Sequence, residues 1–500
     1  MEETATELPA VTAADNNNYK QSKYNLLLTI RKYPFVNILI VIFLVIFSIG
    51  TVNELSDSYP YFYPLLRIAP NASVFQTIVR PANSCLPYRH LNNTPTKVPS
   101  PTGSTPPKPL PPIIWISIIN LSSYLPGLIL SVVYSVWSDL YQNRKIFLVL
   151  CITGFLFQAV GSVLTVATTA SPAAIIPGNV ISGLFGNYPT FLFSCYAYVV
   201  DIDLKISRTT RFVIIQFVIF VAEAITATTS ERWAKYYGFK PPLIFAVVLL
   251  ALAVIYTVIF LQAHLVVATK NYEIKRAKDH IPDLWRNFPK FFKTIYKPGE
   301  DASRKYYYAL LVIFFFTMFP TTGFAEIINI YLAGYPLCWN LDQILEYDTY
   351  RAASFAIGGI VVWLAFKKIL SEMSIAGIGM TFFTVQIGIL SMATHNPTVY
   401  GTIAVGAVGG VTFPCIYGQL SSVVSNENQG VLFCFIALLE IIIAIVAFPI
   451  YYGIFLASRY SNPSTVFIPI AVLYLIPKCI IWFRTIRNCR NRRHGETSEA

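Results

Sequence analysis

Long apolar runs alternate with short polar segments along most of this chain. A helix that crosses a bilayer needs about 20 mainly apolar residues to span a hydrocarbon core of roughly 30 Å. The eighth run is the shortest, because Arg351 and Lys367 bracket it. The pattern predicts twelve transmembrane helices, near residues 35–52, 112–137, 146–169, 174–200, 212–229, 241–263, 306–332, 352–366, 374–394, 398–424, 430–456 and 465–483.

The composition favours an all-α membrane protein over a large soluble one. Only 12% of the residues are charged and 55% are hydrophobic, whereas soluble domains average about 25% charged residues. A soluble chain with so few charges could not cover its surface with polar groups, but lipid covers most of a membrane protein. Residues 1–33 are polar and the first apolar run is long enough to stay in the bilayer, so we expect no cleavable signal peptide.

The distribution of basic residues predicts the orientation of the chain. With the amino terminus in the cytosol, most of the 37 Lys and Arg residues fall in cytosolic segments, as the positive-inside rule requires. Both termini are therefore predicted to be cytosolic. The net charge of +12 then reflects contact with anionic lipid, so membrane lipid rather than nucleic acid is the expected partner.

This orientation places the long loop 53–111 outside the cytosol. The loop is rich in Pro, Ser, Thr and Asn and holds two glycosylation sequons, at Asn71 and Asn92. A third sequon, at Asn120, falls inside the second predicted helix, where the glycosylation machinery cannot reach it. We expect a glycoprotein of the plasma membrane. The endolysosomal membrane is the alternative, because it also keeps this loop out of the cytosol.

Two of the eight cysteines lie in predicted extracytosolic loops. These are Cys85 and Cys338, which belong to opposite halves of the chain. An oxidising compartment favours a disulfide between them, and such a bond would clasp the two halves on their outer side. Sequence alone places both residues on one side of the membrane but does not give the distance between them.

The longest cytosolic loop divides the predicted helices into two groups of six. It spans about 266–305 and mixes basic with acidic residues. The predicted organisation is an amino-terminal tail at 1–33, a six-helix bundle at 34–265, this linker, a second bundle at 306–484 and a basic tail at 485–500. Two six-helix bundles that rock about a central cavity are the layout of the major facilitator superfamily.

The loop after the second predicted helix resembles the loop 2–3 signature of that superfamily. Its acid is Asp139, and its basic residues are Arg144 and Lys145. In the superfamily these groups latch neighbouring helices and act in gating, but here Ser135 and Gln142 occupy the positions where glycines are expected. The alternative is that the charged cluster only anchors helix ends at the membrane interface.

Three further motifs are more distinctive. They are Ser182-Gly-Leu-Phe-Gly186 leading through Asp201 to Arg208-Thr-Thr-Arg211, then Pro336-Leu-Cys338-Trp339, and Gln429-Gly-Val-Leu-Phe433 leading into Leu439-Glu440. Together they resemble the family of the proton-coupled folate transporter and its thymic stromal cotransporter relatives. In that family the cysteine matching Cys338 pairs with one in the first loop, which implies a Cys85–Cys338 disulfide here. The resemblance also marks Asp201, Arg208 and Arg211 as a loop 4–5 group.

Three predicted helices carry a glutamate within the bilayer, namely Glu223, Glu326 and Glu440. Ionisable groups are costly there, so each is a candidate functional residue. Such a carboxyl group is either protonated and neutral or paired with a cation, and cycling between these states is the basis of proton coupling. The alternative is a neutral glutamate hydrogen-bonded between helices. Near Glu326, the segment Pro320–Gly323 is expected to interrupt the seventh helix at the cargo path, with a packing kink as the alternative.

The resemblance to the folate carrier also contains departures. Gln216 falls where that carrier has a proton-linked glutamate, Thr321 where it has a histidine, and Tyr417 where it has an arginine that serves the anionic cargo. Asn187 falls in place of an aspartate. Glu223 lies seven residues beyond Gln216, on the same helix face about 10 Å further along, and is the candidate to take over the proton role. Folate itself is therefore not the expected cargo.

We interpret the chain as a secondary active transporter of a small organic solute, a polar or anionic metabolite, that works by alternating access, with proton coupling as a further hypothesis. The alternative is a transporter-like sensor or scaffold that binds a ligand without moving it. An enzyme is not expected, because the five histidines are scattered and neither His-Glu-x-x-His nor Gly-x-Ser-x-Gly occurs. No cofactor or metal is expected, and a monomer is favoured over an oligomer. The proton and substrate pathway is predicted to include Gln216, Glu223, Thr321, Glu326, Tyr417 and Glu440.

Overall fold

The structure is a computed structural model of the 500-residue chain. The parts it describes are all helical, apart from short connections, and contain no strand. The predicted tails, most of the predicted linker and the residues Asn71, Cys85 and Asn92 lie outside the described residues. The described residues are 33–68, 112–141, 143–202, 204–262, 301–425, 428–459 and 461–484.

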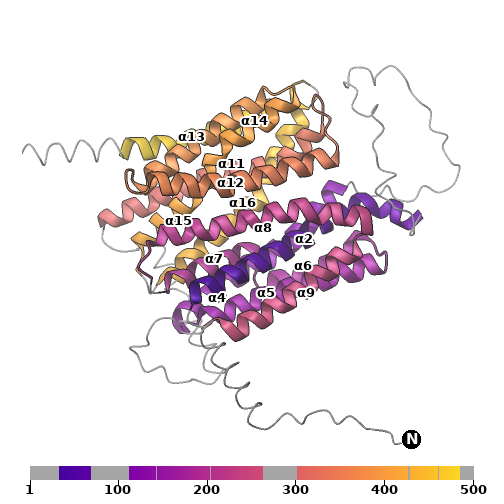
Figure 1. The fold of residues 1–500 in the computed structure, drawn as a ribbon, viewed down its shortest axis with the longest axis horizontal. Coiled ribbons are helices and arrows are strands. Elements are labelled where there is room, and N and C mark those ends of the chain that lie inside the picture. The colour runs from indigo at the N-terminus through magenta and orange to yellow at the C-terminus, as the bar shows by residue number, and fades with distance from the viewer. Residues whose placement is uncertain are drawn as a thin grey trace, which may run out of the picture.

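The amino-terminal half consists of helices that run along the long axis of the molecule (Figure 1). Most are apolar over nearly their whole length, as expected for spans that contact lipid and other helices. They are α2 (Pro34–Ile68), α4 (Pro112–Tyr141), α5 (Arg144–Ala167), the 3-10 helix η3 (Pro172–Ile175), α6 (Ile176–Leu184), α7 (Tyr188–Val200), α8 (Arg208–Tyr237) and α9 (Lys240–Phe260).

The carboxyl-terminal half repeats this design. Its fourth span consists of two α-helices with the 3-10 helix η4 between them. The helices are α11 (Asp301–Ala333), α12 (Leu341–Phe366), α13 (Glu372–Ser391), α14 (Asn396–Gly406), η4 (Ala407–Val411), α15 (Thr412–Val423), α16 (Gln429–Ser458), η6 (Pro463–Val466) and α17 (Phe467–Leu473).

The fourth span of the first half is divided. α6 ends at Leu184 and α7 begins at Tyr188, and between them Gly186 has φ +97°, a conformation that glycine adopts without steric cost. Asn187 then caps α7 by accepting a hydrogen bond from the backbone N–H of Thr190. Eleven candidate spans are long and apolar enough to cross a membrane, and α6 with α7 completes the predicted twelve.

Several helices extend beyond the predicted apolar runs, because they continue through charged residues. α2 reaches Ile68 instead of ending near residue 52. α12 begins at Leu341 instead of near residue 352, where Asn340 and Gln343 form a capping box. α8 is also longer at both ends than predicted. As a result, Arg351 lies inside the eighth span and not at its boundary.

The predicted interruption of the seventh helix at Pro320–Gly323 is wrong. α11 is one continuous helix of 33 residues with Pro320 inside it. A proline removes a single hydrogen bond from the helical ladder, and the ring of Tyr451 in α16 lies directly against Gly323. This close packing from a neighbouring span supports the helix where the proline weakens it.

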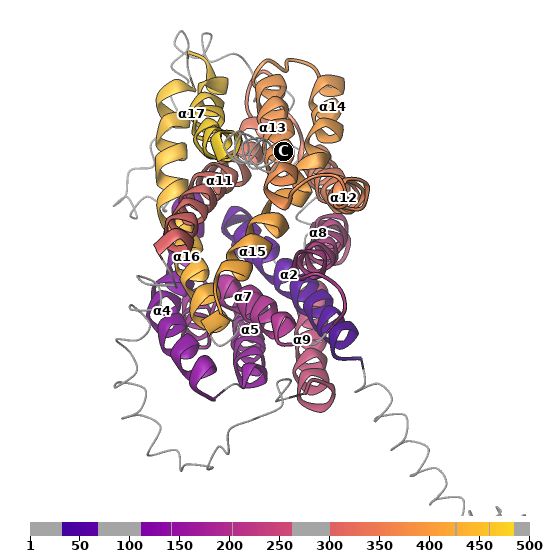
Figure 2. The ribbon, with the colours of Figure 1, turned by 90° about the vertical axis from the view of Figure 1, so that its left-hand side faces the viewer.

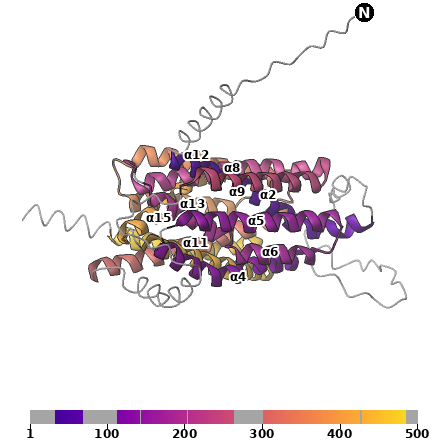
Figure 3. The same ribbon diagram turned by 90° about the horizontal axis from the view of Figure 1, so that it is seen from below.

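The two halves form separate groups that meet along a central seam, as the view along the helix axes shows (Figure 2). Across the seam, α8 packs on α12 and α15, while α16 packs on α4 and α7. The third view shows that the helices of both halves share one long axis (Figure 3). We call the end that holds residues 33 and 484 the tail end. The opposite end, where α2 finishes and α12 begins, is the loop end.

Candidate transport site

Ionisable side chains from both halves meet along the seam. Asp57 interacts with Glu326, a second carboxyl group, and Glu223 interacts with the opposite charge of Arg351; each pair has one member in each half. Glu326 lies within the span of α11, and its side chain is exposed. We call the following eight side chains the central acidic cluster: Glu54 and Asp57 of α2, Glu223 and Glu231 of α8, Glu326 of α11, Asp348 and Arg351 of α12, and Glu440 of α16.

Glu440 has one carboxyl oxygen without a partner. Its Oε2 is buried, and no donor in the described part of the chain forms a hydrogen bond with it. The side chain interacts electrostatically with Tyr124 of α4 and with Tyr188 and Tyr196 of α7, all from the other half. A buried carboxylate charge without a partner is costly, so this site is suited to a proton or to a cationic group of a ligand.

Glu223 and Gln216 both contact tyrosines of α7, as expected for residues on one face of α8. Glu223 accepts a hydrogen bond from the Tyr188 side chain. Gln216 Oε1 accepts one from the Tyr196 hydroxyl at 3.1 Å. The proposed proton residue and the glutamine at the family position therefore lie along one surface.

Thr321 and Tyr417 occupy different surroundings. The Thr321 hydroxyl is hydrogen-bonded to the Tyr474 hydroxyl, a bond that joins two spans of the same half. Tyr417 is buried, and its ring centroid lies 5.4 Å from that of Phe193 and 5.1 Å from that of Tyr196, both in the other half. Of these two predicted pathway residues, only Tyr417 bridges the seam.

Aromatic rings and two close contacts close the seam at the tail end. Arg208 Nη1 donates to the backbone carbonyl of Ser421 in the other half at 2.8 Å. A Cβ at Gly418 would lie 2.1 Å from Thr209 Oγ1, so this approach of α15 to α8 requires glycine. The structure is therefore closed toward the tail end. The rings, which we call the aromatic layer, are Phe193, Tyr196, Phe212, Tyr417 and Phe433.

Arg144 of the predicted loop 2–3 group and Asp201 of the predicted loop 4–5 group form a buried ion pair. Arg144 Nε lies 3.0 Å from Asp201 Oδ2, and Arg144 Nη1 donates to Ser138 Oγ at 2.7 Å. Burial raises the pKa of Asp201 above its ordinary value, and the guanidinium of Arg144 opposes this rise. Lys145 donates to a backbone carbonyl of α9 at 2.7 Å. The side chain of Asp139 is outside those that the structure describes.

Arg211 holds the segment that follows α7. Its guanidinium donates to the backbone carbonyls of Val199, Ile202, Leu204 and Ile206. Four bonds from one buried cation fix the turn that carries the acid of the ion pair. Arg211 of the loop 4–5 group thus holds the backbone of that loop in place, a role that the spacing of the group in the sequence did not reveal.

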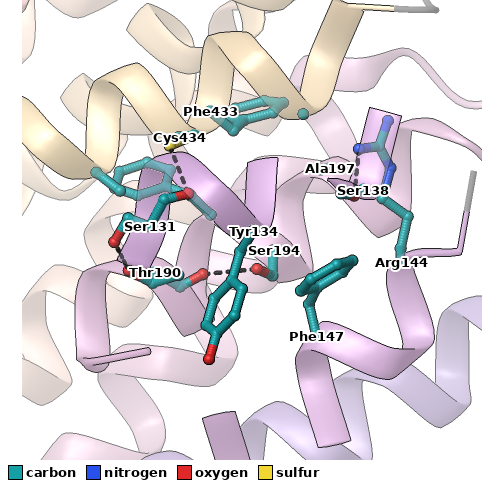
Figure 4. Close-up of a pocket in the computed structure, with 13 residues that line it drawn as sticks. Ser131, Tyr134, Ser138, Arg144, Phe147, Thr190, Ser194, Ala197, Phe433 and Cys434 are labelled. Atoms are coloured by element: carbon teal, nitrogen blue, oxygen red, sulfur yellow. Dashed lines mark hydrogen bonds between the residues drawn. The ribbon is translucent and has the colours of Figure 1, made fainter. Parts of the chain in front are cut away.

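A small pocket lies between α4, α5, α7 and α16 (Figure 4). Ser131 and Thr190 are joined by a hydrogen bond of 2.6 Å, and the Cys434 thiol donates to the carbonyl of Ser131 at 3.1 Å. Arg144 and Phe433 also line the pocket. The pocket therefore contacts both the Arg144–Asp201 ion pair and the aromatic layer, and the motifs that contain Arg144 and Phe433 did not predict a pocket.

Most of the central acidic cluster escapes the sequence analysis, because an apolar-run criterion assigns charged residues at helix ends to loops. The signal in the sequence is the spacing within two charged pairs, Glu54 with Asp57 and Asp348 with Arg351. In each pair the two residues are three positions apart with no proline or glycine between them, which places both on one helix face. The missed residues are Glu54, Asp57, Glu231, Asp348 and Arg351.

Two six-helix bundles that meet along a charged seam are the architecture of a membrane transporter for small organic solutes. The multi-pass topology and the closed tail end agree with a carrier that opens alternately. The chain belongs to the major facilitator superfamily, whose sequence profile matches residues 110–449.

Comparisons with known proteins agree with the predicted family. The chain is 27% identical over 379 residues to the lysosomal proton-coupled steroid conjugate and bile acid symporter of Rattus norvegicus, covering 73% of this chain and 79% of the relative. It is 24% identical over 367 residues to the proton-coupled folate transporter of Rattus norvegicus, covering 73% and 78%. Both relatives are transporters, so the sensor alternative is not favoured.

Solved structures with the same fold are also transporters. The human organic anion transporter MFSD10 superposes with a TM-score of 0.64 at 14% identity, covering 90% of this chain and 99% of that chain. The proton:xylose symporter XylE superposes with a TM-score of 0.60 at 10% identity, covering 90% and 96%. These likenesses confirm the predicted fold of two six-helix bundles.

Proposed function

We propose that the chain is a proton-coupled symporter for an amphipathic organic solute that carries a polar or anionic group. The observation that carries this proposal is the buried, unpartnered Oε2 of Glu440, because an ionisable group in a membrane span that lacks a partner is typical of proton pathways. Both rat relatives are named as proton-coupled carriers, of steroid conjugates and bile acids and of folate. The tyrosines around Glu440 offer ring faces on which an apolar skeleton can pack.

In this mechanism the proton and the solute enter from the loop end. Glu326 is the first to contact them, because its side chain is exposed and interacts with Asp57 of the other half. Glu440 follows, since it interacts with Tyr124, which also interacts with Glu326. Glu223 and Glu440 exchange the proton. Solute and proton then leave at the tail end. Residues that line the solute path without carrying the proton are Gln216, Thr321 and Tyr417.

Opening of the tail end requires the aromatic layer to separate. The hydrogen bond from Arg208 to Ser421 must also break, because it joins the two halves. Bonds within the first half persist, so that this bundle moves as one body. Residues proposed to keep it rigid are Asp139, Arg144, Lys145, Asp201 and Arg211.

The test is uptake into proteoliposomes that contain the full-length chain. Radiolabelled bile acid, steroid sulfate, folate and sugar are supplied outside, with the external solution either acidic or at the internal pH. A gradient of one pH unit is worth about 1.4 kcal/mol, so we expect about tenfold accumulation of an amphipathic acid per unit. Binding without flux under both conditions would instead identify a sensor and contradict the proposal.

We further infer that the tail end faces the cytosol and that the loop end faces outward from the plasma membrane. Cys338 follows α11 at the loop end and is disulfide-bonded. Its proposed partner is Cys85, and the proposed glycan sites are Asn71 and Asn92. All three belong to the first loop, which a shared orientation would place on the same side as Cys338.

Replacement of Cys338 by serine tests the orientation, because it is expected to free the thiol of Cys85. A membrane-impermeant maleimide added to intact cells should then label the variant at Cys85 and leave the parent unlabelled there. Labelling that requires complete permeabilisation would place the chain in an endolysosomal membrane. Labelling as soon as the plasma membrane alone is opened would show that the loop end faces the cytosol and would contradict the orientation.

A further inference from the structure

Arg351 is the only positive charge among the eight side chains of the central acidic cluster. Its Nε and Nη2 both donate to Asp348 Oδ1, at 3.4 and 3.0 Å. A single carboxylate oxygen therefore accepts both hydrogen bonds, and the ion pair is not bidentate. Nη1 makes no hydrogen bond within the described ranges, and the side chain is 24% exposed. The guanidinium therefore keeps a donor edge that is accessible to a ligand.

Asp348 is held from a second direction. Its Oδ2 accepts a hydrogen bond from Asn329 Nδ2 of α11 at 2.9 Å, which fixes the carboxylate within the carboxyl-terminal half. One residue further, the Thr349 hydroxyl forms a hydrogen bond of 3.1 Å with the Thr228 hydroxyl of α8. Arg351 is thus anchored to one half at the place where α12 lies against the other.

The second neighbour of Arg351 is Glu223, which belongs to the opposite half. The two charges interact across the contact between α8 and α12. Glu223 also accepts a hydrogen bond from Tyr188 and interacts with Glu54 of α2. One guanidinium therefore faces carboxylates from two bodies that move relative to each other during transport.

We propose that Arg351 binds the anionic group of the transported solute, and that Glu223 releases Arg351 for this purpose when it takes up a proton. The inference rests on the proposed function and names the residues that join proton to solute. The proton neutralises Glu223, and the solute anion takes its place beside the guanidinium, so the local charge is unchanged. Without Arg351, a cluster of seven carboxyl groups would repel an anion.

The pH dependence of solute binding follows from this exchange. Besides Arg351, the groups in the described part of the chain that interact with Glu223 are Tyr188 and Tyr196 of α7 and Glu54 of α2. Those that face Arg351 within α12 are Asp348 and Tyr347. Only Glu223 faces Arg351 from the other half among these groups. We therefore expect the KM for an anionic solute to fall when the loop-end side is acidified.

The test compares a radiolabelled bile acid with its uncharged methyl ester in proteoliposomes of the full-length chain. Arg351→Gln is expected to raise the KM for the acid roughly ten- to hundredfold, the usual effect of losing a hydrogen bond to a charged group, and to leave ester uptake within about twofold. Arg351→Lys should restore part of the preference because it keeps the charge. Arg232→Gln is the matched control, since that arginine lies at the rim of α8 and is 38% exposed.

A second variant gives an independent readout. Glu223→Gln resembles the protonated carboxyl group, so the KM for the acid should stay low and should no longer change with external pH. In the parent the KM should rise as the external pH rises. A role of Glu223 in structure alone would not remove this pH dependence.

The outcomes separate the two proposals. If the parent transports neither the bile acid nor any other solute of the panel, the proposed function is wrong, and the assignment of Arg351 as the anion-binding residue is then wrong as well. If the parent transports the acid, but Arg351→Gln keeps the preference for acid over ester, only the assignment of Arg351 fails. It also fails if Arg351→Gln loses acid and ester alike, or if Glu223→Gln leaves the KM dependent on pH.

Discussion

Proton-driven accumulation is expected to disappear when Glu440 is replaced by glutamine, while exchange of solute across the membrane continues. Glutamine has nearly the shape of the neutral carboxyl group but cannot release a proton. A cycle in which the proton must leave with the solute is therefore blocked, whereas exchange of one solute molecule for another needs no net proton movement. The expected loss is the whole gradient effect, about tenfold per pH unit.

The measurement is uptake with and without an imposed pH gradient, beside counterflow of labelled against unlabelled solute. Glu346→Gln is the matched control, because this glutamate lies at the rim of α12 with a side chain that is 45% exposed, and it should keep the full gradient effect. If the Glu440 variant accumulates solute as strongly as the parent, the carboxyl group is structural and the coupling proposal is wrong.

Replacement of Arg144 by glutamine is expected to lower the free energy of unfolding by about 3–5 kcal/mol, the usual cost of leaving one member of a buried ion pair without its partner. Arg144 and Asp201 are only 3% and 8% exposed, so water cannot replace the lost contact. The variant also loses the bond from Arg144 to Ser138. The effect should appear as a lower midpoint of thermal unfolding in detergent.

The double variant Arg144→Gln with Asp201→Asn should recover much of this loss, since it leaves no unpaired charge. Lys235→Gln is the matched control, because the Lys235–Asp342 pair is 30% and 49% exposed and such pairs contribute about 1 kcal/mol or less. An Arg144 variant as stable as the Lys235 variant would mean that the buried pair contributes little. That result would contradict the proposed rigidity of the first bundle.

Hydropathy alone predicted the number of spans but misplaced several of their ends. The run-based criterion ends α2 near residue 52, although the helix continues past Glu54 and Asp57 to Ile68. It begins α12 after Arg351, although the helix already starts at Leu341. In each case the charged residues interact with side chains of the other half, so they avoid lipid, where an ionisable group is most costly.

The candidate site was predicted in part. Glu223, Glu326 and Glu440 were identified because an ionisable residue inside an apolar run is conspicuous. Arg351 was not, because it was assigned to the boundary of a predicted helix and its proposed role depends on Glu223, 128 positions earlier. The motif residues Arg144 and Asp201 were each noticed, but only the folded chain shows that they form one ion pair.

The amino-acid sequence by itself determined that this chain enters a membrane, that it forms twelve helices in two sets of six, and which family it resembles. These properties depend on the transfer of each residue and its near neighbours from water to lipid, which is a local quantity. Only the tertiary structure decided which polar side chains share the seam and that the tail end is closed. Packing between distant helices sets their rotation and length, and no local pattern encodes those contacts.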